Sequence, residues 1–239
     1  MRLVIFDIDG TLVRTGKTNQ VLYERIFREE YQINLAELDW TQARFSTDSG
    51  LMPFIFEQAR GRPPEPKDIA KVRRLFKNYW QEYLATVSPR QFAVPGAAKL
   101  LAMLREQSEW GLALASGGWK DLARVKLGGI GVKIDGIAGA FADDAQARTR
   151  IISLAIESAR RTYKTPVFER TVYVGDAFWD VAAAARLGLA FVGVGSGETA
   201  DDLRSSGASL VIRDYTDQAA FMHALDRAPV PVHRDAPLD

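Results

Sequence analysis

Short, unbroken apolar runs alternate along the chain with segments in which apolar residues recur at helical spacing. Uninterrupted runs rich in β-branched residues are typical of strands buried on both faces, as in a parallel sheet. The pattern predicts strands at residues 3–6, 112–115, 171–174, 190–194 and 210–212, and a weaker one at 137–141. Helical spacing predicts helices at residues 97–107, 121–127, 148–163, 178–187 and 201–206. Because strands that alternate with helices form βαβ units, the predicted fold class is α/β, with a doubly wound parallel sheet.

Residues 15–90 interrupt this alternation, because they carry helical spacing and no convincing strand. Helices are predicted at residues 20–31, 49–59 and 68–85, with a glycine- and proline-rich loop at 61–66. We therefore predict an α/β core formed by residues 1–14 and 91–227, with an all-helical domain at 15–90 inserted after the first strand. Residues 228–239 contain several prolines and are predicted to form a loosely ordered tail.

Composition narrows the chemistry that this chain can perform. Its 239 residues include 31 Lys and Arg against 30 Asp and Glu, for a formal net charge of +1. This balance gives no reason to expect a nucleic-acid or membrane-surface partner. Since neither a membrane-length apolar run nor a signal-peptide pattern is present, we expect a cytoplasmic protein. With no cysteine and only two histidines, acid–base or metal chemistry must rely on carboxylates.

Two carboxylates, Asp7 and Asp9, directly follow the first predicted strand. In an extended chain, residues two apart point to the same side, and open α/β sheets bind ligands at the carboxyl ends of their strands. Two acids this close repel each other unless a cation or a shared proton intervenes, and Mg²⁺ typically binds one or two carboxylates plus a phosphate. Gly10 then permits a sharp turn. The alternative is an ordinary Asp-Gly turn with both acids in water.

Polar groups also follow two later strands. Ser116 and two glycines come after the strand predicted at 112–115 and lead into a helix, whose free N–H groups can bind an anion. Asp176 follows a later strand, and Asp180 comes four residues after it. The alternatives are a helix cap for Ser116 and a helix-dipole contact for Asp180. Because the carboxyl ends of neighbouring parallel strands form one crevice, these groups are predicted to gather with Asp7.

In this order, the motifs resemble those of the haloacid dehalogenase-like (HAD) hydrolase superfamily over nearly the whole chain, up to about Asp226. The stretch DIDGT resembles the motif D-x-D-x-T, and GDAFWD resembles G-D-x-x-x-D. The resemblance implies a Rossmann-like core on which the helical insert is a cap domain. It also implies that Asp7 is the nucleophile, that Asp9 is the general acid and base, and that Mg²⁺ is the cofactor. The implied metal ligands are Asp7, Asp176 and, through its main-chain carbonyl, Asp9.

The resemblance further implies a set of groups that hold the transferring phosphate, with two residues in supporting roles. The phosphate-binding set is Thr11, Ser116, Gly117 and Arg148, and the supporting residues are Gly10 and Asp180. The family places a lysine or arginine before a helix ahead of its last acidic motif, and the segment around Arg148 is similar to a subgroup with arginine there. Arg150 and Lys126 remain alternatives for this cation. An arginine suits phosphate because its planar fork matches the oxygens.

The position of the insert resembles that in phosphoglycolate phosphatases and β-phosphoglucomutases. This branch implies a Mg²⁺-dependent phosphatase that acts on a small phosphomonoester, such as phosphoglycolate, through an aspartyl-phosphate intermediate. The alternatives are a phosphosugar mutase, a 2-haloacid dehalogenase, against which Asp9 and Asp176 argue, and a catalytically silent binding protein of the same fold. Residues 47–50 resemble a substrate-facing segment of the cap, and a plain helix cap explains them equally. We expect a small phosphorylated metabolite as partner, no nucleic acid or membrane, and a monomer or homodimer.

Overall fold

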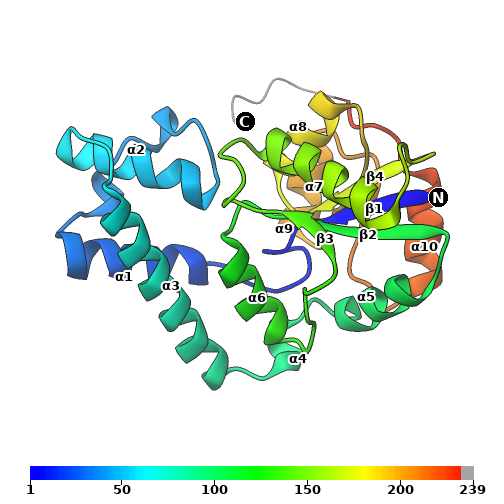
Figure 1. Cartoon of the computed structure of the whole chain (residues 1–239), viewed down its shortest axis with the longest axis horizontal. Coiled ribbons are helices and arrows are strands. Elements are labelled where there is room, and N and C mark those ends of the chain that lie inside the picture. Colours follow the sequence, from blue (N-terminus) through cyan, green and yellow to red (C-terminus); the bar gives the residue numbers. More distant parts are fainter. Residues whose placement is uncertain (233–239) are drawn as a thin grey trace.

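A sheet-containing core stands beside a group of helices in the computed structural model, which describes residues 1–232 (Figure 1). Within these residues, six parallel strands form one sheet in the order β3-β2-β1-β4-β5-β6. The strands are β1 (Arg2–Phe6), β2 (Trp110–Ala115), β3 (Ala138–Ala140), β4 (Thr171–Gly175), β5 (Ala190–Val194) and β6 (Val211–Ile212). The predicted doubly wound α/β core is thereby confirmed, including its weak strand near residues 137–141.

Strand β1 lies at the centre of the sheet, with β2 on one side and β4 on the other. Its last residue, Phe6, lies opposite Leu114 of β2 and Val174 of β4. Consequently, the polar residues that follow these three strands emerge together at one edge of the sheet. The chain changes its direction of winding at β1, and such a switch point is where open α/β sheets bind ligands.

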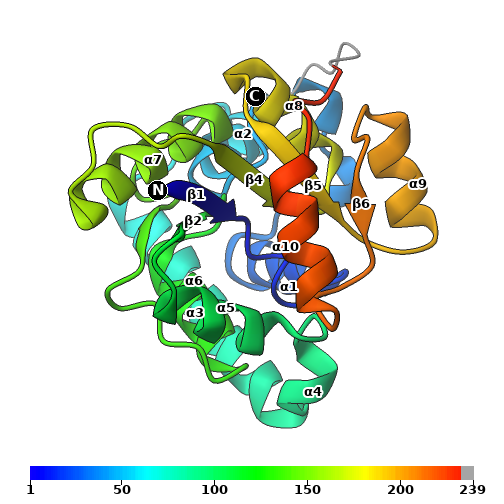
Figure 2. The same cartoon turned by 90° about the vertical axis from the view of Figure 1, so that its right-hand side faces the viewer.

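Successive side chains of β1 enter two different buried layers, as the pleat of a strand requires. Leu3 and Ile5 enter one layer, and Val4 and Phe6 enter the other. The first layer is covered by α7 (Arg148–Tyr163), α8 (Phe178–Leu187) and α9 (Glu198–Ser205), and the second by α5 (Ala97–Glu106), α6 (Lys120–Gly128) and α10 (Gln218–Arg227) (Figure 2). Burial on both faces explains why the strands are continuous apolar runs. The sequence pattern does not predict α10.

The inserted helices form a lobe of their own with an aromatic interior. The lobe contains α1 (Thr18–Tyr31), α2 (Asp48–Arg60), α3 (Pro66–Thr86) and two 3₁₀ turns (Leu35–Glu37 and Trp40–Gln42), and α4 (Pro89–Phe92) leads back to the core. Tyr23 and Phe76 join α1 to α3, with ring centroids 4.4 Å apart, and Phe27 and Phe56 join α1 to α2 at 6.0 Å. These aromatic residues recur at helical spacing because they form the core of the lobe.

Two adjacent chain segments connect this lobe to the sheet. The amide of Arg14 donates to the carbonyl of Phe92 at 2.7 Å, and the amide of Val94 donates to the carbonyl of Leu12 at 3.1 Å. The segment that leaves the core therefore lies beside the segment that returns to it. This pairing supports the proposed division into a core and a cap domain at residues 15–90.

The start of the predicted tail is attached to the core. Ala228 is buried, and its carbonyl accepts a hydrogen bond from Arg170. The carbonyl of Pro229 accepts from the amide of Phe191 in β5 at 3.0 Å. These contacts differ from the loosely ordered tail that the prolines suggest, because main-chain carbonyls pair here with the sheet and its flank. The rest of the predicted tail, residues 233–239, lies outside the described residues.

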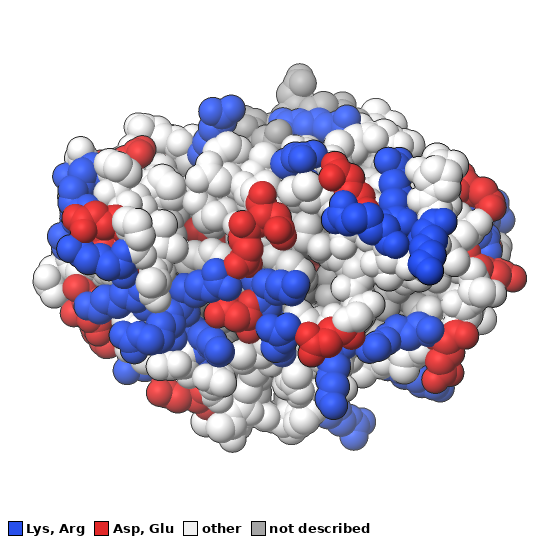
Figure 3. All heavy atoms as spheres, viewed as in Figure 1, with Lys and Arg blue, Asp and Glu red and all other residues white. Residues whose placement is uncertain are grey.

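Basic and acidic side chains are interspersed on the face shown in Figure 3. This mixture agrees with the nearly balanced formal charge of the sequence. In the described part of the chain, no helix combines the length and the apolar character needed to cross a membrane.

Candidate active site

Asp7 stands directly after β1, at the centre of the sheet edge. The residue is only 4% exposed, and Nη1 of Arg148 lies 3.3 Å from its Oδ1. Burial raises the pKa of the Asp7 carboxyl well above its usual value, and the nearby Asp180 raises it further, while Arg148 opposes both. Arg148 alone does not offset burial and the charge of Asp180, so an additional cation would stabilise the ionised form of Asp7.

Gly10 allows Asp176 to approach the turn after β1. Its φ of +84° lies in the left-handed region, and a Cβ atom there would come within 1.9 Å of Asp176 Oδ2. The hydroxyl of Thr11, predicted to bind phosphate, instead donates to Asp176 Oδ1 at 3.0 Å. Thr11 is fully buried, so its contact in this structure is with the acid expected to hold the metal.

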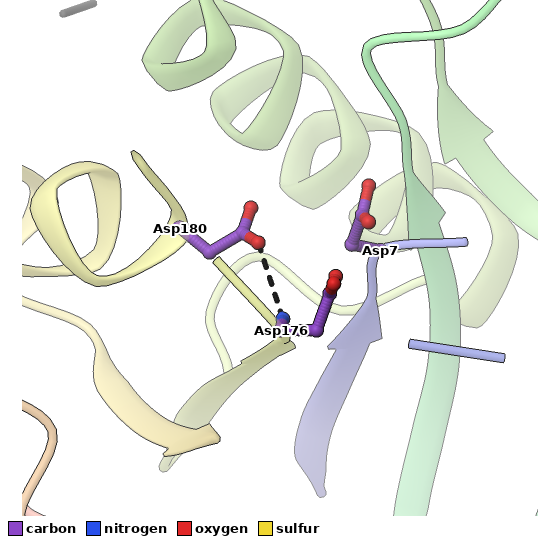
Figure 4. A group of neighbouring side chains, drawn as sticks. All are labelled: Asp7, Asp176 and Asp180. Atoms are coloured by element: carbon purple, nitrogen blue, oxygen red, sulfur yellow. Dashed lines mark hydrogen bonds between the residues drawn. The ribbon is translucent and has the colours of Figure 1, made fainter. Parts of the chain in front are cut away.

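Asp180 is the fully buried anchor of the loop that carries Asp176. Its Oδ1 accepts hydrogen bonds from Tyr173 at 2.8 Å and from Arg148 at 3.0 Å. Its Oδ2 accepts from the main-chain amide of Asp176 at 3.2 Å (Figure 4). The same oxygen accepts from the main-chain amide of Ala177 at 3.1 Å. Asp180 therefore fixes both the end of β4 and the orientation of the arginine, and its supporting role in a reaction stays a prediction.

The acidic cluster is suited to a divalent cation. One oxygen from each of Asp7, Asp176 and Asp180 lies within 4.8 Å of the others. Burial and the neighbouring Asp180 raise the pKa of Asp176 to about 8, so its ionised form is disfavoured here and a bound cation would favour it. Because protein donors already occupy Asp180, the side chains available as ligands are Asp7 and Asp176. A ligand role for the main-chain carbonyl of Asp9 stays a prediction.

The three candidate cations of the sequence have different positions. Arg148 reaches Asp7 and Asp180 from the first turn of α7, whereas Arg150 is exposed and pairs with Glu157 on the same helix. The third candidate, Lys126, is buried and lies against Asp9 rather than Asp7. The sequence offered Arg148 and Lys126 as alternatives, but the structure brings both of them to the site, each to a different carboxylate.

The loop after β2 faces this acidic cluster. The hydroxyl of Ser116 is buried and accepts the amide of Gly118 at 3.1 Å. Gly117 lies so near the guanidinium that a Cβ atom would be 3.0 Å from Arg148 Nη2. Within the described residues, the buried Nε of Arg148 has no hydrogen-bond partner, so the guanidinium retains a donor for an anion. These groups line a cavity of about 820 Å³ together with Asp7.

Residues 47–49, here called the cap clasp, attach the cap to the core beside this loop. The amide of Asp48 donates to the carbonyl of Gly117 at 2.7 Å. The hydroxyls of Thr47 and Ser49 donate to the carbonyls of Gln146 at 2.7 Å and Ala145 at 3.1 Å. The Thr47 hydroxyl also accepts the amide of Gly50, so it caps α2 at the same time. The helix-cap interpretation of this segment is confirmed, and its resemblance to a substrate-facing segment stays a prediction.

The side chain of Asp48 is buried where the clasp meets the core. Its Oδ1 accepts from the hydroxyl of Tyr23 at 2.7 Å, and its Oδ2 accepts from the amide of Trp119 at 3.0 Å. Burial raises the pKa of this carboxyl to about 6, although Lys126 and the two hydrogen bonds act in the opposite direction. Sequence pattern alone predicts no such contact for Asp48, because a polar residue before a helix is adequately explained as a cap.

A parallel α/β core, an acidic cluster at its switch point and helices over that cluster define an α/β enzyme with a capped, carboxylate-based site. The chain belongs to the haloacid dehalogenase-like hydrolase family, whose sequence pattern matches residues 1–188. It is therefore a hydrolase, and the family resemblance carried by its motifs is confirmed.

The similarity to known proteins extends over almost the whole chain. A phosphoglycolate phosphatase from Caulobacter vibrioides is 24% identical over 232 residues, which cover 95% of this chain and 94% of that protein. Among solved structures, a hydrolase from Pseudomonas syringae is 24% identical, with a TM-score of 0.66 covering 94% of this chain and 99% of that one. A β-phosphoglucomutase from Clostridium difficile is 17% identical, with a TM-score of 0.65 covering 94% and 95%. At these identities, the structural similarity shows a common fold.

Proposed function

We propose that this hydrolase is a Mg²⁺-dependent phosphatase that acts on a small phosphomonoester through an aspartyl-phosphate on Asp7. The observation that carries the proposal is the buried Asp7 carboxylate, placed at the switch point beside Arg148, which has an unpaired N–H donor within the described residues. An anionic nucleophile and an anionic phosphate can meet only where positive charge offsets their repulsion. Arg148 supplies part of that positive charge, and a Mg²⁺ ion held by Asp7 and Asp176 would supply the rest.

The proposed reaction has two steps on the same aspartate. An oxygen of Asp7 forms a bond to phosphorus while the bond to the leaving oxygen breaks, and Asp9 gives that oxygen a proton. A water oxygen then forms a bond to phosphorus while the bond between phosphorus and the Asp7 oxygen breaks, and the water passes a proton back to Asp9. The products are inorganic phosphate and an alcohol, and both acids return to their starting states.

The other groups of the site hold the phosphate in line. Arg148, the hydroxyl of Ser116 and the amide of Gly117 are placed to bind its equatorial oxygens. Asp7 and Asp176 would hold a Mg²⁺ ion, which when bound supplies positive charge that offsets the repulsion between nucleophile and phosphate. The cap, through residues 47–49 and α1, would exclude bulk water from the cavity.

A substrate panel separates the proposed phosphatase from two alternatives within the family, a phosphosugar mutase and a 2-haloacid dehalogenase. The phosphoglycolate phosphatase of Caulobacter vibrioides makes phosphoglycolate the first substrate to test. The β-phosphoglucomutase fold relative makes phosphosugars the second. A 2-haloacid dehalogenase would give no role to Asp9 as an acid and base or to Asp176 as a metal ligand. These two compounds and a 2-haloacid therefore form the minimal panel.

Phosphate release from p-nitrophenyl phosphate tests the proposal directly. We expect release with Mg²⁺, its loss with EDTA, and a fall on the order of 10⁴-fold or more for Asp7→Asn, since the variant lacks the nucleophile. Detection of a phosphorylated Asp7 peptide after rapid acid quenching would identify the intermediate. Absence of phosphate release from every phosphate ester in the panel, with Mg²⁺ present, would refute the proposed function.

A further inference from the structure

Lys126 is a buried cation that the proposed reaction leaves unused. Its side chain lies on α6 of the core and is only 2% exposed. The ammonium donates to Asp9 Oδ1 at 2.6 Å and to Asn19 Oδ1 at 3.0 Å. Because a buried ammonium is costly without partners, these two oxygens are what keep it in place.

The rest of the surroundings of Lys126 come from the cap. The ring of Trp80 on α3 lies 4.7 Å from the ammonium, and that of Phe76 lies 5.8 Å away. Asn19, on α1, is itself held by the indole N–H of Trp80 at 3.1 Å. Lys126 therefore has its complete set of partners only when α1 and α3 lie on α6.

Lys126 also determines which oxygen of Asp9 is available. It holds Oδ1, whereas Oδ2 faces the loop after β2, where a Cβ atom on Gly118 would be 3.6 Å away. With Oδ1 accepting from the ammonium, a proton that passes to a leaving group is carried by Oδ2. The Asp9 side chain is 23% exposed and follows a strand end, so an alternative direction would be open to it without this partner.

We propose that Lys126 is a positioning residue that aims Oδ2 of Asp9 at the leaving oxygen, and that it does so only while the cap lies on the core. The inference rests on the proposed phosphatase function. Its consequence is that enclosure of the substrate and alignment of Asp9 occur together. With the cap displaced, Asn19 and Trp80 leave the ammonium, and the carboxylate loses its fixed direction.

The dependence of the rate on the leaving group tests this role. Phenolate needs a proton when it leaves, whereas p-nitrophenolate needs much less help, and the two aryl phosphates otherwise have nearly the same shape. For Lys126→Met, we expect kcat/KM to fall about 100-fold with phenyl phosphate and about tenfold or less with p-nitrophenyl phosphate. Lys120→Met is the matched control, since it makes the same change at an exposed position of α6, and we expect it to leave both values unchanged.

Two further variants connect Lys126 to Asp9 and to the cap. In an Asp9→Asn background, Lys126→Met should change the ratio of the two kcat/KM values little. Each substitution impairs proton donation by residue 9 to the leaving oxygen, so the second has little left to remove. Asn19→Ala, on the cap side, should change the ratio in the same direction as Lys126→Met but by a smaller factor, about threefold. Lys126→Arg should restore part of the loss, since it keeps the charge.

The outcomes separate this inference from the proposed function. An equal loss with both substrates for Lys126→Met at an unchanged thermal midpoint, or no loss, would overturn the positioning role. If Lys126→Met does not fold, the ratio for Asn19→Ala decides, and an unchanged ratio for that variant would overturn the positioning role. Absence of phosphate release by the unmodified protein from both aryl phosphates and from every phosphate ester of the panel, with Mg²⁺ present, would refute the phosphatase function instead.

Discussion

The two halves of the site differ in where their partners come from. Around Asp7, the paired Arg148 and the neighbouring Asp180 belong to the core, on α7 and α8. Asp9 contacts Lys126, which belongs to the core. The groups that enclose the ammonium of Lys126 belong to the cap helices α1 and α3. One half is therefore complete within the sheet domain, and the other depends on the seating of the cap.

This difference separates two requirements of the proposed reaction. Nucleophilic attack needs a fixed arrangement of charge, which a rigid core supplies before the substrate arrives. Proton exchange with the leaving group needs an acid in the right direction and little bulk water, and cap closure can supply both. Substitutions in the core half should therefore affect folding and metal binding, and substitutions in the cap half should affect closure.

The largest effect on stability is expected from Arg148→Met. The substitution leaves Asp7 and Asp180 buried without their cation, and removal of one member of a buried ion pair typically costs about 3–5 kcal/mol. The free energy of unfolding, measured by urea denaturation without metal, should fall by that amount. Arg150→Met, two residues along the same helix, removes only an exposed pair with Glu157 and should cost less than about 0.5 kcal/mol. Similar values for the two variants would contradict the core arrangement.

Much of the core half is predictable from the sequence, because it depends on local pattern. Unbroken apolar runs identify strands buried on both faces, and the polar residues after them must meet at the sheet edge. This reasoning brings Asp7, Ser116 and Asp176 together from the order of strands and polar residues alone. The helix α10 is missed even though Phe221 and Leu225 recur at helical spacing, because it follows the last predicted strand, where no further βαβ unit demands a helix.

The cap half is not predictable in this way, because its contacts join residues far apart in the chain. Lys126 and Asp9 are separated by 117 positions, and nothing in the spacing of either reveals the other. Lys126 lies in a helical pattern, where a lysine is ordinarily an exposed residue. The clasp at residues 47–49 carries an N-cap pattern, and its contacts with the core involve main-chain carbonyls, which leave no trace in sequence.

The next largest effect concerns Asp48, whose burial depends on the cap clasp. Its pKa is raised to about 6 in the folded protein from an ordinary value of 3.8, so the folded state binds the proton more tightly than the unfolded state. The contribution to stability is therefore fully present below the unfolded pKa and is lost as pH rises through the folded pKa. Relative to Asp48→Asn, the stability of the unmodified protein should fall by about 3 kcal/mol between roughly pH 4 and pH 7.

Urea denaturation of both proteins over this pH range provides the measurement. Other titrating groups are common to the two proteins and cancel in the difference. A difference that does not change with pH would show that Asp48 is not buried as an acid between Tyr23 and Trp119, and that the cap lies away from the core in solution.

Metal binding should depend on the carboxylates of the core half and not on the side chain of Lys126. At a Mg²⁺ concentration ten times the dissociation constant, binding to the folded state should add about 1.4 kcal/mol to the free energy of unfolding. We expect this stabilisation in the unmodified protein and in Lys126→Met, and we expect its loss in Asp176→Asn, which removes a ligand. Thermal unfolding with MgCl₂ and then with EDTA measures it. Stabilisation by Mg²⁺ that disappears in Lys126→Met but persists in Asp176→Asn would contradict a metal site at Asp7 and Asp176.

The smallest effect is expected at the edge of the interface between cap and core. Arg73 on α3 pairs with Asp121 of α6 at 2.9 Å and with Asp143 at 2.7 Å, and all three side chains are partly exposed. Arg73→Met should therefore lower the free energy of unfolding by only about 0.5–1 kcal/mol. Its larger effect should be on cap opening, seen as faster hydrogen exchange at residues 47–50, where the amide of Asp48 donates to the core.

The dependence of this exchange difference on salt concentration tests whether the ion pairs of Arg73 cause it. Partly exposed ion pairs are screened at high ionic strength, so the difference in exchange between Arg73→Met and the unmodified protein should shrink in about 1 M NaCl. Arg124→Met is the matched control, because Arg124 pairs with Asp135 within the core and does not bridge to the cap. If both variants accelerated exchange at residues 47–50 equally, the acceleration would reflect general loosening of α6, and the ion pairs of Arg73 would have no specific part in seating the cap.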